Sequence, residues 1–324
     1  MAQQCGDFAR KTLMARKHLL LLHIKSPHLH TTSHIIHQNL TKMKQGYTEE
    51  ELKKLHHCLH EILKETARVC HELGIRFFMV GGSVIGCHFW NDIIPFDDDI
   101  DIGMTRNDYE RFLQEAPAKL GSKFFLQWLG TDPHTPFYFA KVRMNGTEFV
   151  EETTRHIKMH QGIFVDVFPF DRIPDDARLC RRQRKMVNTI NAMLVSKEIW
   201  RWRYFGHCAL PQPLPHSWLS CLVDRLAVTF VPKRWLYAWL KREQTRYNDQ
   251  KTAFYNHVVT DIDQIRTENI ERLETATFGE LQVFVPGNYM EYLNHHYPNL
   301  RKHLPQEEID KYSHRPLRLS FGGQ

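Results

Sequence analysis

The chain has 324 residues, of which 42% are hydrophobic and 25% are charged, as is typical of a globular protein large enough for a sizeable core. Its formal net charge of +6 suits a phosphate-bearing partner but is too small to indicate a nucleic-acid-binding protein. The seven cysteines are odd in number and contain no C-x-x-C pair, which argues against a disulfide framework and a structural zinc site and favours a reducing, cytoplasmic compartment. No apolar run is long enough to span a membrane, which argues against a transmembrane segment.

Residues 1–42 differ in composition from the rest of the chain. They contain one acidic residue, Asp7, among many basic residues and histidines, and no helical or strand period persists. A transit-like segment has a similar composition. We favour a disordered tail or a non-native extension, followed by a folded domain at residues 43–324.

A long helix is predicted at the start of this domain. Thr48 and Glu51 have the spacing of a capping box, apolar residues then recur every three or four positions, and Gly74 marks the end. His56 and His60 lie four positions apart and could share a metal ion. Since no third ligand is evident, we expect them on a solvated face of the helix.

A glycine-rich turn is predicted after the next strand. Residues 75–80 read as a short buried strand, and Gly81, Gly82 and Ser83 lead into a helical turn that ends near Trp90. Glycines at a strand-to-helix junction let the backbone approach a ligand, and the amides of the helix N-terminus then face a phosphate. Alone this pattern is more often a plain turn. Its position shortly before the acidic stretch strengthens the interpretation as a phosphate-binding turn.

The acidic stretch at residues 95–104 reads Pro-Phe-Asp-Asp-Asp-Ile-Asp-Ile-Gly-Met. If it is a strand, Asp97, Asp99 and Asp101 point to one face and the two isoleucines to the other. Two aspartates in this arrangement can hold a hard divalent cation, so we predict that Asp99 and Asp101 bind Mg²⁺ or Mn²⁺. An acidic surface loop is the alternative, and the regularly placed apolar residues argue against it.

The following elements are predicted to be a helix, two strands and a hairpin. Asn145-Gly146 is a typical hairpin turn. Lys141 and Arg143 share one face of the first arm, where they are either solvated cations or groups that neutralise a phosphate. The expected ranges are a helix from Thr105 to about Leu120 and strands at residues 124–128, 137–144 and 147–150.

Residues 162–169 form the most apolar predicted strand, and Asp166 lies inside it. A lone carboxylate in a buried strand is unfavourable unless it is paired or bound to a metal. Asp166 is therefore predicted to be a third acid, brought beside Asp99 and Asp101 by sheet pairing. Asp171 follows the expected strand end and is interpreted as a turn residue or helix cap.

Residues 177–248 are predicted to be helical and are rich in basic and aromatic residues. Core packing of an inserted helical subdomain explains most of this pattern, with a linker at Pro211, Pro213 and Pro215. A basic aromatic surface that touches a lipid-linked or polyanionic acceptor is the alternative, and it would place the protein peripherally on a membrane. Residues 281–285 read as a strand and residues 289–296 as a short helix.

The order of these motifs resembles the LicD family. Gly-Gly-Ser, the acidic stretch, Phe-Ala-Lys-Val-Arg and Gly-Ile-Phe-Val-Asp-Val-Phe-Pro-Phe-Asp follow in the family order, and residues 278–293 are also similar. The similarity runs from about residue 48 to 314. It implies an α/β fold with a mixed sheet, a nucleotidyltransferase-like core and a helical insertion at about 177–248. Phe89-Trp90-Asn91-Asp92 stands where the family usually carries an Arg-His pair.

The family includes bacterial phosphocholine transferases and the fukutin-related proteins. The resemblance implies metal-dependent transfer of a phospho-alcohol, in the first instance phosphocholine, from a CDP-alcohol to a glycan or glycolipid hydroxyl, as in lipopolysaccharide biosynthesis. Asp99 and Asp101 then correspond to the metal pair, with Asp166 as the third acid, and Gly82-Ser83 to the donor-phosphate loop. The alternatives are a nucleotidyltransferase that releases pyrophosphate from a nucleoside triphosphate, and an inactive binding homologue.

Overall fold

The computed structural model describes residues 46–205, 226, 229–257, 263–298, 300–303 and 315–323. The tail expected at residues 1–42 and the proline linker at residues 211–215 lie outside this part of the chain. Among the described residues, no helix combines the length and apolar character needed to cross a bilayer.

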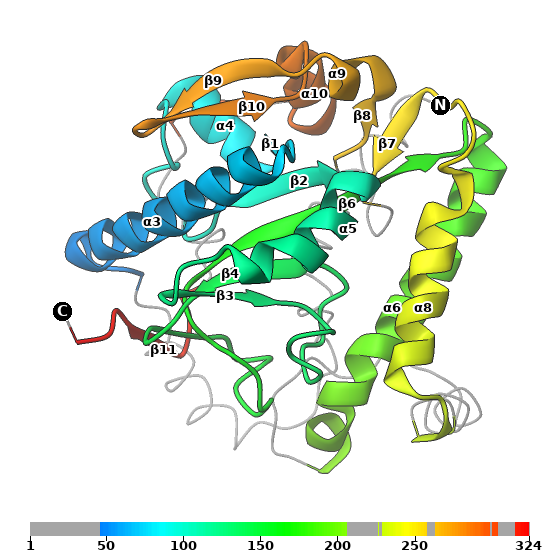
Figure 1. Ribbon diagram of the computed structural model, residues 1–324, viewed down its shortest axis with the longest axis horizontal. Helices are drawn as coiled ribbons and strands as arrows, with labels where there is room; N and C mark the ends of the chain where they lie inside the picture. Colours follow the sequence, from blue (N-terminus) through cyan, green and yellow to red (C-terminus); the bar gives the residue numbers. More distant parts are fainter. Residues whose placement is uncertain are drawn as a thin grey trace, which may run out of the picture.

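A mixed sheet forms the centre of the molecule (Figure 1). Strands β2 and β6 are parallel and the other neighbouring strands are antiparallel. The α/β class with a mixed sheet is therefore confirmed. The strand order is β1 (Phe78–Met79), β2 (Asp101–Thr105), β6 (Phe164–Ile173), β4 (Ala140–Met144) and β3 (Phe124–Gln127), with β7 (Phe254–Asn256) beside the end of β6 and β8 (Ile265–Arg266) beside β7.

Helices α3 (Glu49–Leu73) and α5 (Arg106–Glu115) cover one face of this sheet (Figure 1). Helices α6 (Ala177–Phe205) and α8 (Lys233–Gln244) pack against each other at one side of the molecule. Both lie within residues 177–248, which were predicted to be helical. The remaining elements are α4 (Gly82–Phe89), α9 (Thr267–Glu271), α10 (Tyr289–His296), the short 3₁₀ turns at Ala116–Ala118 and Thr245–Tyr247, the pair β9 (Glu274–Phe278) and β10 (Leu281–Val285), and the pair β5 (Glu148–Val150) and β11 (Arg318–Ser320).

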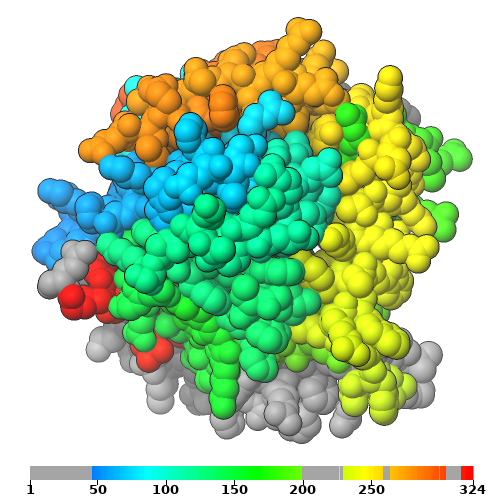
Figure 2. All heavy atoms as spheres, viewed as in Figure 1, coloured from blue at the N-terminus to red at the C-terminus, as the bar shows by residue number. Residues whose placement is uncertain are grey.

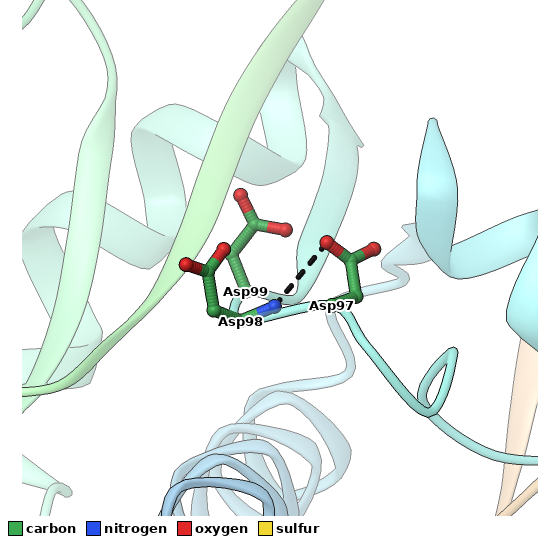
Figure 3. A group of neighbouring side chains, drawn as sticks. All are labelled: Asp97, Asp98 and Asp99. Carbon is green, nitrogen blue, oxygen red and sulfur yellow. Dashed lines mark hydrogen bonds between the residues drawn. The ribbon is translucent and has the colours of Figure 1, made fainter. Parts of the chain in front are cut away.

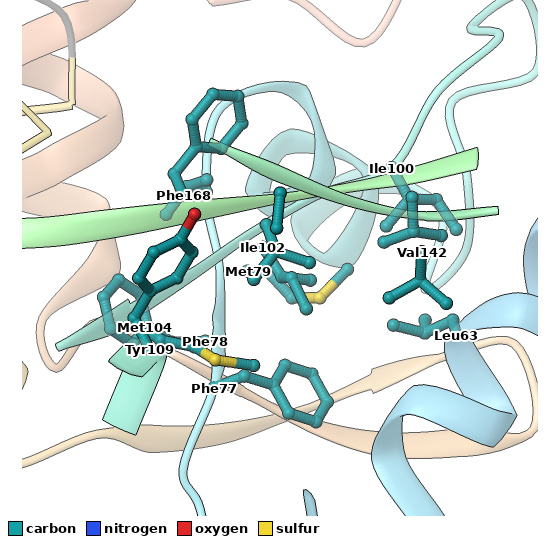
Figure 4. Close-up of a cluster of buried hydrophobic side chains, with 14 of the residues drawn as sticks. Leu63, Phe77, Phe78, Met79, Ile100, Ile102, Met104, Tyr109, Val142 and Phe168 are labelled. Carbon is teal, nitrogen blue, oxygen red and sulfur yellow. The ribbon is translucent and has the colours of Figure 1, made fainter. Parts of the chain in front are cut away.

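Helix α3 carries the capping box that its sequence predicted. The Glu51 N–H donates to the Thr48 hydroxyl over 3.1 Å, and the Thr48 N–H donates to the Glu51 carboxylate over 2.8 Å. Gly74 ends the helix at a φ of 62°, in the left-handed region that favours glycine. The apolar stripe of α3 packs on the sheet, where Leu63 faces Val142 (Figure 4).

The acidic stretch is a strand only in its second half. β2 begins at Asp101, and residues 97–100 precede it without a regular strand assignment, yet burial still alternates, with Asp97, Asp99 and Asp101 less buried than Asp98, Ile100 and Ile102. Ile100 and Ile102 are fully buried, as predicted.

The predicted hairpin is wrong in its pairing. Asn145-Gly146 does turn the chain, and Gly146 has a φ of 78°, but β5 does not return along β4. The neighbours of β4 are β6 and β3, while β5 pairs with β11 near the end of the chain. The more apolar β6 takes the central position because both of its faces are buried.

Asp171 was interpreted as a turn residue or helix cap, but it lies within β6 and is fully buried. Its carboxylate is bound by the guanidinium of Arg106, with Nε 2.9 Å from Oδ1 and Nη2 2.5 Å from Oδ2. Asn248 donates to the same carboxylate over 2.7 Å. A buried carboxylate with these donors is a structural ion pair that joins α5 to the sheet.

Candidate functional site

Three charged residues occupy neighbouring positions on adjacent strands. Asp101 on β2 is the neighbour of Asp166 on β6, which is in turn the neighbour of Lys141 on β4. The Lys141 Nζ lies 2.5 Å from Asp166 Oδ1, and both residues are buried. Sheet pairing therefore brings Asp166 beside Asp101, as the sequence predicted.

A compact group of carboxylates lies just before β2 (Figure 3). Asp97, Asp98 and Asp99 each offer an oxygen, and these three oxygens lie within 4.8 Å of one another. The Asp98 N–H donates to Asp97 Oδ1 over 3.2 Å, and the Tyr47 hydroxyl donates to Asp98 Oδ2 over 2.7 Å. Asp97 and Asp98 were not among the predicted ligands, although four acids within five positions already signalled such a group.

The electrostatics of this group fit a divalent cation. Burial, followed by repulsion from Asp99, Asp98 and Asp101, raises the pKa of Asp97 well above its ordinary value. Burial also raises the pKa of Asp166, an effect that Lys141 opposes. A cation among the aspartates would relieve the repulsion that raises the pKa of Asp97.

The glycine-rich turn is packed against the acids. Gly81 has a φ of 59° at the start of α4, and the Asp101 N–H donates to the Ser83 hydroxyl over 2.9 Å. A Cβ added to Gly82 would lie 2.9 Å from Asp97 Oδ2, closer than such contacts normally come. The turn predicted to hold phosphate and the acids predicted to hold metal therefore lie in contact.

Gly82→Ala is expected to displace the Asp97 carboxylate and weaken Mg²⁺ binding by about tenfold, as supporting contacts of metal sites do when they are lost. Titration calorimetry with Mg²⁺ measures the effect. Gly121→Ala is the matched control, because its Cβ would meet nothing closer than 3.4 Å. Equal Mg²⁺ affinity in both variants would show that the close approach at Gly82 does not matter.

His56 and His60 do not lie on a solvated helix face, so that interpretation is wrong. The His56 Nε2 lies 2.8 Å from the Asp97 carbonyl oxygen, and the His60 Nε2 lies 2.7 Å from Asp92 Oδ1. Burial lowers the pKa of His56. The two histidines bind the loop between α4 and β2 and so help to position the acids.

Lys141 and Arg143 are buried, with 3% and 1% of their surface exposed, which rules out the solvated alternative for both. The Arg143 guanidinium donates to Gln127 Oε1 over 2.6 Å and to the Gly162 carbonyl over 2.5 Å. Burial lowers its pKa to about 10. Lys141 thus lies at the acids, whereas the hydrogen bonds of Arg143 tie β4 to its surroundings.

A buried chain of polar side chains reaches the glycine turn from the C-terminal half, and sequence reasoning missed it. The Gly81 N–H donates to the Tyr292 hydroxyl over 2.8 Å, and that hydroxyl donates to Asp263. His257 Nε2 lies 3.4 Å from Asp263 Oδ2, and the Tyr138 hydroxyl lies 2.8 Å from His257 Nδ1. No short motif marks these residues, because they meet only after folding.

Tyr292→Phe is expected to lower the free energy of unfolding by about 1–3 kcal/mol, because the Gly81 N–H and Asp263 both lose a buried partner. Urea unfolding measures this difference. Tyr289→Phe on the same helix is the control, since Tyr289 is only partly buried. A loss no larger for Tyr292→Phe than for the control would contradict the proposed link between α10 and the turn.

Phe89 and Trp90, which replace the usual Arg-His pair, lie at the C-terminal end of α4. The glycine turn lies at the opposite end of this helix. The departure from the family pattern is therefore separated from the glycine turn by the length of α4, about 12 Å at the ordinary helical rise.

Comparison with known proteins gives three related findings. A family described as LicD/FKTN/FKRP, nucleotidyltransferase domain, matches residues 74–189, which include the glycine turn, the acids, Lys141 and Asp166. The lipopolysaccharide cholinephosphotransferase LicD of Haemophilus influenzae is 23% identical over 273 residues, covering 79% of this chain and 93% of that protein. The ribitol 5-phosphate transferases FKRP of Homo sapiens and Mus musculus are each 38% identical over 69 residues, 20% of this chain and 14% of each relative.

Proposed function

The chain belongs to the LicD family, and from this we propose that it transfers a phospho-alcohol from a CDP-alcohol to a hydroxyl of a glycan or glycolipid. The printed names of the relatives, a cholinephosphotransferase and a ribitol 5-phosphate transferase, support this class of reaction. The observation that carries the proposal is the register of Asp101, Asp166 and Lys141 beside the aspartate group and the glycine turn. Phosphocholine is the proposed group and CDP-choline the proposed donor.

Asp99 and Asp101, with Asp166, are the proposed ligands of Mg²⁺ or Mn²⁺, and Asp97 offers a further oxygen within 4.8 Å of one from Asp99. When bound, the ion neutralises charge on the donor diphosphate. Among the protein's own groups, the N-terminus of α4 at Gly82 is the proposed contact for the phosphates. The Gly81 N–H is bound by Tyr292, and the Ser83 hydroxyl fixes the turn on β2. Arg143, which was predicted to neutralise phosphate, is now assigned a supporting role in β4.

The transfer requires one proton acceptor and one leaving group. The acceptor hydroxyl oxygen attacks the phosphorus nearer the alcohol, the bond from that phosphorus to the bridging oxygen breaks, and CMP departs. Asp166, whose pKa is raised by burial, is proposed either to complete the metal site or to accept the hydroxyl proton. Lys141 holds this carboxylate in place and adds positive charge.

The proposal includes a cytoplasmic location. Cys58, Cys70, Cys87 and Cys180 are free thiols in the described part of the chain, as a reducing compartment allows. The acceptor is proposed to be a saccharide of the lipopolysaccharide type, either free or linked to a lipid.

Incubation with CDP-choline, CDP-ribitol or CDP-glycerol in the presence of Mg²⁺ and a lipopolysaccharide-derived saccharide tests this function. Mass spectrometry should detect the saccharide with one phospho-alcohol added, most readily phosphocholine. An unmodified saccharide with every donor, under conditions where the protein is folded and binds Mg²⁺, would favour the inactive binding homologue.

A further inference from the structure

The largest exposed apolar side chains gather on the helical insertion. Eight such side chains are exposed in the described part of the chain, and six of them lie between residues 179 and 239. Trp235 is 63% exposed and Trp239 is 43% exposed, both on α8, and Phe230 just before the helix is 75% exposed. Tryptophan is costly to leave in water at such exposure, so this concentration calls for a partner.

The exposed residues of α8 form one face of the helix. Arg234, Trp235, Ala238, Trp239 and Arg242 are all exposed and recur at steps of one, three and four. The opposite face carries the buried residues Leu236, Leu240, Glu243 and Gln244, and α8 packs against α6. We call the exposed set the α8 outer face. Figure 2 shows the yellow segment that contains α8 at the surface of the molecule.

The charges of α8 are divided between its two sides. Lys233 and Lys241 are neutralised by Glu198 and Glu110, at 2.6 Å and 2.7 Å. Arg234 and Arg242 have no ion pair within the described part of the chain, and the α8 outer face contains no acidic residue. Two arginines beside two tryptophans on an otherwise uncharged face form a site complementary to an anionic, partly apolar surface.

We propose that the α8 outer face docks the protein on a bilayer that contains anionic phospholipids. Indole rings partition into the headgroup layer, and arginines at the same level are attracted to lipid phosphates. A second copy of the chain fits this face less well, because two identical faces would bring their arginines together. This docking does not depend on the proposed reaction.

Flotation of the purified full-length chain with phosphatidylcholine vesicles, with and without phosphatidylglycerol, tests the proposal. The protein should float only with vesicles that contain phosphatidylglycerol, and less at high salt. Trp235→Ser with Trp239→Ser should abolish flotation, and Arg234→Gln with Arg242→Gln should weaken the affinity roughly thirtyfold for two charges. Because these side chains are exposed, circular dichroism and the melting temperature should not change.

The matched control is Leu317→Ser with Arg318→Gln, which removes an exposed apolar residue and an exposed arginine beside β11. This variant should float like the wild type. Absence of flotation for the wild type, or equal flotation of the double tryptophan variant, would overturn the proposal. Self-association that the tryptophan variant abolishes, with no flotation of the wild type, would also overturn it and assign the face to a second copy. None of these readouts needs a donor or turnover, so their failure is distinguishable from failure of the proposed function.

Discussion

Asp101→Asn is expected to lower turnover on the order of 10³-fold, since loss of several kcal/mol of charge stabilisation at a metal site corresponds to about three decades in rate. The substitution keeps the size of the side chain and removes the carboxylate of the residue that pairs with Asp166 in the sheet. Asp99→Asn should act in the same way. Both effects are measured as initial rates over a range of Mg²⁺ concentrations, together with Mg²⁺ affinity.

These variants should fold at least as well as the wild type without metal, because each removes a charge from a group whose mutual repulsion raises the pKa of Asp97. Asp97→Asn is now also expected to weaken Mg²⁺ binding, since its carboxylate lies in the compact group. The exposed Asp249 supplies the control Asp249→Asn, which should leave turnover unchanged. Near-normal turnover of Asp101→Asn at low Mg²⁺ would exclude the proposed metal site.

Lys141→Met is expected to lower the free energy of unfolding by about 3–5 kcal/mol, because it leaves a buried carboxylate without its cation. Lys141 Nζ and Asp166 Oδ1 are 2.5 Å apart, and the Lys141 ammonium also lies 3.4 Å from the centre of the Phe164 ring. Loss of the ammonium should raise the pKa of Asp166 further above its ordinary value. Chemical denaturation at neutral pH measures the loss of stability.

Two further variants separate the buried pair from a general effect of removing lysine. Lys141→Met combined with Asp166→Asn should recover much of the lost stability, because no buried charge is then left unpaired. Lys123→Met removes an exposed ion pair with Glu61 and should change stability by no more than about 1 kcal/mol. If Lys141→Met were no more harmful than Lys123→Met, the buried pair would not have the energetic role assigned to it.

Elements whose boundaries depend on local chemistry could be predicted from the sequence. Helix α3 begins and ends where its capping box and Gly74 indicate, because these signals act within one turn of the helix. The predicted ranges of β10 and α10 also match the structure, with Pro286-Gly287 as the turn between them.

Contacts between distant segments could not be predicted in the same way. The pairing of β5 with β11 joins parts of the chain about 170 residues apart, and a local Asn-Gly signal carries no information about that partner. Likewise, the Tyr292 hydroxyl reaches Gly81 across 211 residues. Asp166 was more accessible to prediction, because a carboxylate within an apolar strand requires a partner wherever that partner lies in the sequence.

The nucleotide that the enzyme releases tests the central claim most directly. The protein is incubated with Mg²⁺ and a saccharide acceptor, with CTP in one reaction and CDP-choline in another, and the products are separated by chromatography. We predict Mg²⁺-dependent CMP from CDP-choline in the wild type, on the order of 10³-fold less from Asp101→Asn, and no pyrophosphate from CTP. Pyrophosphate released from CTP, with CDP-choline, CDP-ribitol and CDP-glycerol all left intact, would contradict phospho-alcohol transfer and identify the protein as a nucleotidyltransferase.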